Sequence, residues 1–129
     1  MEIIVSVVTC NGKYLLLQRQ MQKKYPGKWE FVSSRIFDGK PLDVQARELI
    51  MFETGLQASL VKNGKMFSVQ DQYGEWIIHP YLFSCNQSIV GLRKHEHQSH
   101  KWINLEEIDQ FDTVTDIKKN LISLDLKNN

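Results

Sequence analysis

The chain has 129 residues with 42% hydrophobic and 24% charged side chains, which is the composition of an ordinary folded protein with a buried core. A formal net charge of +1 excludes a surface built to coat a polyanion and indicates no specific nucleic-acid partner. We expect a single domain over residues 1–129. The apolar start, residues 3–8, is too short to span a membrane and lacks the basic flank of a signal peptide, which predicts a cytoplasmic protein without a membrane partner.

The chain begins with two apolar runs, residues 3–9 and 13–19, which predict two strands. Asn11-Gly12 joins them, and this dipeptide is the strongest short signal for a hairpin. A polar loop over residues 20–28 then leads into the short run 29–32. The N-terminal quarter is therefore expected to form a hairpin followed by one short strand.

The stretch "GKPLDVQARELIMFETGL" predicts the main helix, roughly over residues 42–54. Pro41 suits the start of a helix, and Gly55 is typical of the residue that ends one. Glu48 and Glu53 are the only glutamates in this stretch. They are five positions apart, about 140° around a helix of 3.6 residues per turn, so they do not easily share one metal ion.

Further strands are expected after the helix. Residues 58–61 and 66–69 flank a second Asn-Gly turn at 63–64, and residues 76–83 predict another strand. Together with the N-terminal strands they predict one mixed sheet in an α/β protein.

The C-terminal part is expected to be mostly loop and helix. The polar stretch 93–101 predicts a loop before a short last strand at Trp102-Ile103. Residues 105–111 predict a short helix, and Thr115 is the expected cap of a final one. That final helix places three apolar side chains on one face: Ile117, Leu121 and Leu124.

Four segments taken in chain order resemble the Nudix hydrolase superfamily, to which the MutT-like proteins belong: "LLLQRQ", "YPGKWEFVSSRI", "GKPLDVQARELIMFETGL" and "HEHQSHKWINLEEID". The resemblance covers most of the chain. It implies an α/β/α sandwich with a mixed sheet. It also implies hydrolysis of nucleoside diphosphates linked to another group, with Mg²⁺ or Mn²⁺ as the cofactor.

The family box reads G-x5-E-x7-R-E-U-x-E-E-x-G-U, in which U is a bulky apolar residue and the glutamates hold the metal. Aligned without gaps from the Gly55-Leu56 end, only Glu53 matches a box glutamate. The first box glutamate is replaced by Lys40 and the box arginine by Glu48, and the two remaining acids are replaced by Leu49 and Phe52. The reversed charges of Lys40 and Glu48 are either a retained ion pair or two unrelated solvated charges.

A second register uses Arg47-Glu48-Leu49 as the R-E-U core and needs one inserted residue before Gly55. It keeps Glu48 but places Met51 and Phe52 where the paired acids belong. Most of the metal ligands are absent in both registers, and the sequence does not choose between them.

The candidate metal ligands are Glu53 and Glu48, and the candidate catalytic residues are these two and Glu96. Glu53 lies in an apolar stripe of the helix, so it is either paired near a cleft or a frayed acid of the last turn. Glu96 lies in the loop where some relatives carry a catalytic base. Three histidines surround it, and we expect solvated loop side chains rather than metal ligands there: His95, His97 and His100.

The candidate substrate-binding residues are Arg19, Arg35 and Trp29. The resemblance places the two arginines near substrate phosphate, and surface charge is the alternative. Trp29 is expected in the core rather than as a platform for a base. Cys10 and Cys85 predict free buried thiols, with one disulfide as the alternative.

We therefore expect a relative of the pyrophosphohydrolases whose metal-dependent activity is lost or strongly reduced, so that no cofactor is one expected outcome. An active hydrolase that gathers Mg²⁺ or Mn²⁺ with Glu53, Glu48, Glu96 and substrate phosphates is the first alternative. A non-catalytic nucleotide-binding or protein-interaction module is the second. The expected ligand is a nucleoside-diphosphate-linked small molecule. A homodimer stays open, because homodimers are frequent among the resembling proteins.

Overall fold

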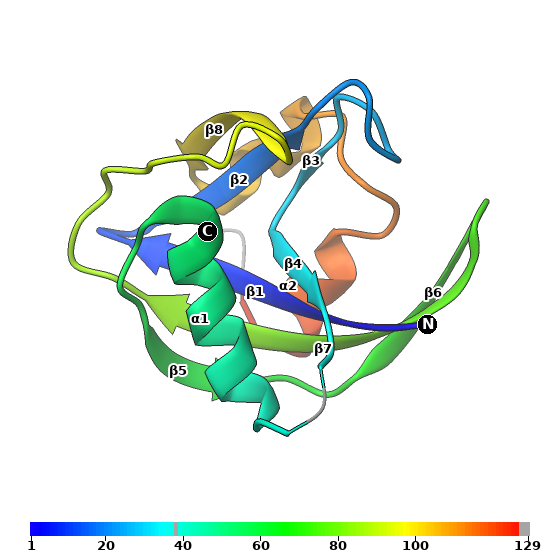
Figure 1. Cartoon of the computed structure of the whole chain (residues 1–129), viewed down its shortest axis with the longest axis horizontal. Coiled ribbons are helices and arrows are strands. Elements are labelled where there is room, and N and C mark those ends of the chain that lie inside the picture. The colour runs from blue at the N-terminus through cyan, green and yellow to red at the C-terminus, as the bar shows by residue number, and fades with distance from the viewer. Residues whose placement is uncertain (38, 127–129) are drawn as a thin grey trace.

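The computed structural model describes residues 1–37 and 39–126 and contains one mixed sheet with helices on both faces (Figure 1). The helical elements are α1 (Leu42–Thr54), the 3-10 helix η1 (Leu105–Gln110) and α2 (Lys118–Ser123). The sheet has eight strands: β1 (Glu2–Cys10), β2 (Lys13–Arg19), β3 (Trp29–Glu30), β4 (Val32–Arg35), β5 (Ser59–Asn63), β6 (Phe67–Asp71), β7 (Gly74–Ser84) and β8 (His97–Ile103).

Strand β1 organises the sheet. It runs parallel to β7 and antiparallel to β2 and β4, which makes the sheet mixed. After the hairpin at Asn11-Gly12, β2 separates from β1 and continues between β3 and β8, while β4 takes its place beside the first half of β1. This divergence brings β3, β2 and β8 side by side at one end of the sheet, where the C-terminal end of α1 also arrives (Figure 1).

Apolar side chains fill both faces of the sheet, which gives the predicted α/β/α sandwich. On one face α1 buries Ala46 and Ile50 completely, one helical turn apart, against the sheet. On the other face α2 and η1 cover a second cluster. The predicted apolar face of the last helix is confirmed, because all three of its residues are buried there: Ile117, Leu121 and Leu124.

Helix α1 has the predicted bounds and ends at the predicted glycine. Gly55 adopts a left-handed conformation with φ of 75°, and its N–H donates to the carbonyl of Met51 at 2.8 Å. Glycine adopts this conformation without the steric cost that a side chain adds. The end of α1, with Glu53 in its last turn, is therefore fixed by a local backbone signal.

Four predicted elements differ in the structure. The run 29–32, predicted as one strand, is divided between β3, which pairs with β2, and β4, which pairs with β1. Asn63-Gly64 does not connect a hairpin, since β5 and β6 each pair with β7 instead. Gly64 is required for another reason: a Cβ there would clash with the hydroxyl of Ser123 in α2. The final helix is not capped by Thr115, because Asp116 has φ of 56° and α2 begins only after Ile117.

The last strand is longer than predicted. It starts at His97 rather than Trp102, because the whole segment 97–103 pairs with β2. Residues 97–101 are all polar, so this part of the strand lacks the apolar alternation by which a half-buried strand is predicted. The extension moves His97 from an expected loop into the sheet.

The predicted free thiols are confirmed: Cys10 and Cys85 are buried and not joined by a disulfide. They lie at neighbouring ends of β1 and β7, where the Cys85 N–H donates to the Thr9 carbonyl at 3.0 Å. In the described part of the chain, no helix has the length and apolar character needed to cross a membrane.

Candidate functional site

A pocket of about 530 Å³ opens on the sheet face that α2 covers. Its wall draws on strands β1 to β4, β6 and β7, on the loop 20–28, on Glu96 and on the segment 114–120. The apolar part of the wall consists of side chains from the core cluster of this face: Val5, Phe31, Val69, Trp76, Ile78 and Ile117. The pocket therefore has an apolar surface large enough to hold a small ligand.

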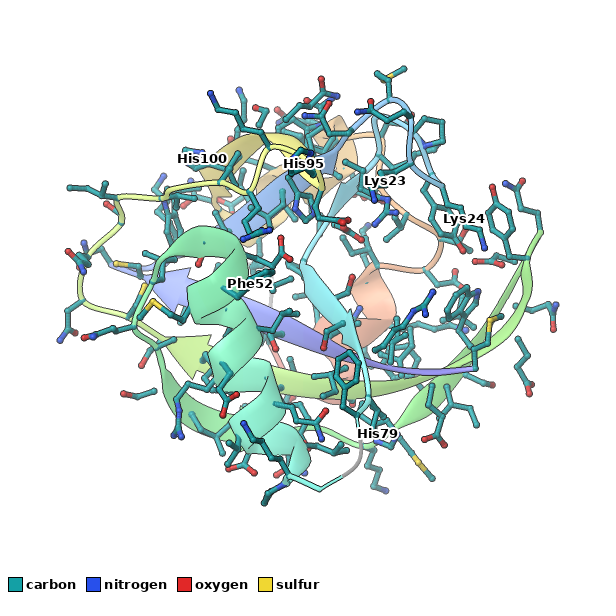
Figure 2. The ribbon with its side chains drawn as sticks, viewed as in Figure 1. Lys23, Lys24, Phe52, His79, His95 and His100 are labelled. Carbon is teal, nitrogen blue, oxygen red and sulfur yellow. The ribbon has the colours of Figure 1, made fainter. Side chains whose placement is uncertain are left out.

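Four cations line the pocket: Arg19, Lys23, Lys24 and Arg35. Lys23 is paired with Glu96 at 3.1 Å, and the Lys24 ammonium lies 4.9 Å from the centre of the Tyr73 ring. Figure 2 shows Lys24 extending from the β2–β3 loop toward the β6–β7 hairpin. Arg35 is exposed.

A charged acceptor, Asp71, also faces this pocket. The Tyr25 hydroxyl and the Trp76 indole donate hydrogen bonds to its carboxylate. Burial opposes ionisation of Asp71, but the hydrogen bonds from Tyr25, the Tyr73 backbone and Trp76 outweigh it and lower the pKa of the carboxyl group. Asp71 therefore stays ionised and also anchors the loop 20–28 to the β6–β7 hairpin.

A neutral acceptor, Asn120, comes from α2. Its side chain is 4% exposed, and its amide nitrogen donates to the Ile117 carbonyl at 3.1 Å. Its carbonyl oxygen has no hydrogen-bond partner within the described part of the chain, although it is buried and the residue lines the pocket. A buried carbonyl without a donor is costly, so this oxygen is suited to accept a hydrogen bond from a ligand.

Four charged side chains form an ionic cluster at one side of the pocket: Arg19 and Glu30, which also line it, and Glu53 and His97, which do not. Because β3, β2 and β8 are neighbours, they place Glu30, Arg19 and His97 side by side. Glu30 Oε2 lies 3.0 Å from the Arg19 guanidinium and 2.8 Å from His97 Nε2. The last turn of α1 adds Glu53, whose Oε2 lies 3.6 Å from His97 Nδ1.

The ionic cluster fixes the charge of His97. Burial of the ring lowers its pKa, but the contacts with Glu30 and Glu53 and the charges of both carboxylates outweigh burial and raise the pKa to about 9. At neutral pH His97 is therefore an imidazolium. Two cations and two anions then make the ionic cluster electrically neutral.

The residues around Glu53 do not fit a divalent metal ion. Magnesium and manganese require oxygen ligands, and the nearby side chains of α1 at the substituted box positions, Leu49 and Phe52, offer none. The Glu53 carboxylate instead faces a ring nitrogen that carries a proton. Among the described residues, no group of three or more His, Cys, Asp or Glu side chains is placed to hold a metal.

The structure separates the two predicted metal ligands. Glu53 is 8% exposed and paired, so the frayed-acid alternative is wrong. Glu48 lies on the exposed side of α1 and forms an ion pair with Lys40 at 2.9 Å, with both side chains more than half exposed. The pair predicted for the ungapped register is therefore present.

Three of the other predicted site residues, Arg19, Arg35 and Glu96, line the pocket. Trp29 is not among the residues that line it; its ring packs edge-on against Phe111 at 5.2 Å, as expected for a core side chain.

The prediction of solvated loop histidines is correct for His95, which is exposed, and wrong for His97, which is 5% exposed. His100 is half-buried on β8. Figure 2 shows His95 and His100 beyond the end of α1 that carries Phe52, and the Phe52 ring packs there against the Arg93 guanidinium at 3.9 Å.

Sequence reasoning missed Glu30, His97 and Asn120 as members of these sites. Glu30 follows Trp29 in a two-residue strand, and nothing in its neighbours shows that it is 6% exposed. No local pattern marked His97, because the five residues before Trp102 are all polar and do not alternate with apolar ones.

An α/β/α sandwich with a mixed sheet, a helix ending at the box glycine and this pocket define a Nudix-type domain. The family model of the NUDIX domain matches residues 2–124, and the chain belongs to this family. It is similar to the CTP pyrophosphohydrolase of Escherichia coli (strain K12), with 28% identity over 113 residues, which cover 85% of this chain and 80% of that protein.

Solved structures share the fold. The MutT protein from Methanosarcina mazei Go1 is 18% identical, with a TM-score of 0.79, over 97% of this chain and 92% of that one. The NUDIX domain of Shewanella oneidensis NrtR, solved in complex with ADP ribose, is 14% identical, with a TM-score of 0.77, over 97% of this chain and 86% of that one.

Proposed function

We propose that this NUDIX-family protein binds a nucleoside phosphate or a nucleoside-diphosphate derivative in its pocket, with metal-dependent hydrolysis lost or strongly reduced. One observation carries the proposal: cations, the Asp71 carboxylate and the unpaired Asn120 carbonyl converge on the pocket, while the acids that would bind a metal are dispersed or already paired.

The cationic side of the pocket suits phosphate groups. Lys24 and Arg35 form no ion pair with an acid among the described residues, so their charges are available to a ligand. Arginine binds phosphate oxygens with two parallel N–H donors, which adds geometric selection. We assign Arg35 and Lys24 as the phosphate-binding residues.

The remaining polar groups suit a nucleoside. Asp71 and the carbonyl oxygen of Asn120 are acceptors, so they favour hydroxyl and amino groups on the ligand. The adjoining apolar wall, which includes Trp76, favours a flat or apolar ring. The name of the Escherichia coli relative makes CTP the first ligand to test, and the NrtR complex makes ADP-ribose the second.

Reduced hydrolysis follows from the ungapped register of the box, which two observations favour. Ile50, at the bulky apolar position of that register, is completely buried, and Lys40 and Glu48 form the substituted ion pair. In this register Leu49 and Phe52 replace metal-binding acids. Without them the protein lacks the charge that activates water and stabilises the transition state.

The active-hydrolase alternative requires Glu48, Glu53 and Glu96 to act together. Glu96 lines the pocket beside Lys23, but Glu48 is on the exposed side of α1 and Glu53 faces His97. Because the three acids lie apart, the arrangement supports ligand binding rather than hydrolysis.

Calorimetry with CTP and with ADP-ribose, each in a chelator, tests the binding, and product analysis with Mg²⁺ or Mn²⁺ tests turnover. We expect binding without metal and slow or no hydrolysis. Fast hydrolysis that requires metal would refute the loss of activity, and absence of binding to both probes would refute the assigned ligand class.

We also propose that the chain is a single cytoplasmic domain. The match of the family model to residues 2–124 supports one domain. Assembly into a homodimer stays a prediction, which light scattering would test.

A further inference from the structure

The His97 ring lies between two buried carboxylates. Its Nε2 is 2.8 Å from Glu30 and its Nδ1 is 3.6 Å from Glu53. The side chains of Glu30 and Glu53 are 8% and 10% exposed, so water compensates little of their charge. Buried carboxylates of this kind need a cation beside them, because an uncompensated charge inside a protein is strongly unfavourable.

The two carboxylates depend on His97 to different degrees. Glu30 also receives hydrogen bonds from Arg19 at 3.0 Å and from Ser33 at 3.3 Å. Among the residues that the structure describes, Glu53 makes an ion pair with His97 only, and its Oε2 accepts no hydrogen bond from any of them. His97 is therefore the one described cation that compensates Glu53.

We propose that the His97 side chain is a built-in cation that replaces a divalent metal between Glu53 and Glu30. It joins the last turn of α1 to β8 and β3 with a covalently attached charge. The domain thus needs no metal to hold this corner, and the ring and its charge deny the position to a metal ion. The proposal does not depend on which ligand the pocket binds.

The strongest test is a double-mutant cycle in which the change in Tm caused by Glu53→Gln should have opposite signs in the wild-type and His97→Ala backgrounds. In the wild-type protein, Glu53→Gln removes an ion pair and should lower the Tm by several degrees. In the His97→Ala background, the same change removes a buried charge that has lost its cation, so it should raise the Tm by several degrees. The packing lost through His97→Ala is missing from both the single and the double variant. It therefore does not affect the sign of the Tm difference between them.

A second measurement tests the metal itself. Wild-type protein should melt at the same temperature in chelator and in millimolar manganese chloride. His97→Ala leaves two carboxylates and an open space, so manganese should raise its Tm, by roughly 10 °C at a hundredfold excess over Kd. Glu53→Gln in the same background should abolish this gain. His100→Ala, on the same strand and without an ion pair among the described residues, is the matched control and should behave as wild type.

If His97→Ala does not fold in chelator, the proposal predicts that it folds when manganese is present and that the double variant with Glu53→Gln folds without metal. The proposal is overturned if Glu53→Gln lowers the Tm equally in both backgrounds. It is also overturned if manganese stabilises the wild-type protein, or if a folded His97→Ala protein gains nothing from manganese.

Discussion

Raising the pH from 6 to 9 should destabilise the protein through His97. The ring pKa is raised from 6.5 to about 9 in the folded protein, so folding favours the protonated form. Below pH 6.5 the folded and unfolded states both carry this proton, and the full stabilisation is present. As the pH rises toward 9, the unfolded chain loses the proton while the folded protein keeps it, and the free energy of unfolding falls.

The structure sets the size of this effect. One pKa unit corresponds to about 1.4 kcal/mol, so the difference between 6.5 and about 9 corresponds to about 3 kcal/mol. No discount for solvent is needed, because the His97 side chain is 6% exposed. A loss of this size is a substantial part of the stability of a small domain, about 5–15 kcal/mol.

Urea unfolding across this pH range measures the effect, with His97→Gln as the comparison. Glutamine is neutral, so the difference between wild type and variant isolates the contribution of the His97 charge. We expect the free energy of unfolding of the wild type to fall by about 3 kcal/mol more than that of His97→Gln between pH 6 and 9. His100→Gln should show the same dependence of the free energy of unfolding on pH as the wild type. Equal slopes for wild type and His97→Gln would show that the ionic cluster does not hold a proton on His97.

Three further substitutions test the remaining assignments. Arg35→Ala should weaken calorimetric binding of CTP or ADP-ribose by about tenfold or more, the usual loss for a hydrogen bond to a charged group, and leave the Tm unchanged; equal weakening by Arg47→Ala, an exposed arginine outside the pocket, would contradict the assignment. Ile50→Ala should cost about 2–5 kcal/mol in urea unfolding, because it empties a completely buried position of α1, and a cost near zero would place α1 wrongly. Lys40→Ala should cost less than about 1 kcal/mol, since the pair with Glu48 is more than half exposed, and a larger cost would give that pair a structural role.

Local patterns in the sequence determined most of the fold. The Asn11-Gly12 hairpin, the bounds of α1 and the apolar face of the last helix were all predicted, and all are present. Each depends on a short-range rule: a turn conformation, a glycine at a helix end or the periodicity of apolar residues. The resemblance to the Nudix superfamily predicted, in addition, that these elements combine into one α/β/α sandwich.

The tertiary structure decided what the charged residues do. Glu48 and Glu53 lie on one helix and were both candidate metal ligands, yet one forms an exposed pair with Lys40 and the other is buried against His97. Glu30 gave no sign of a role at all. Burial and ion pairing depend on which strands become neighbours, and β3, β2 and β8 are brought together by pairings between residues far apart in the chain. Because a charge interacts with whatever surrounds it in space, sequence alone left Glu53 either paired or frayed and could not name its partner.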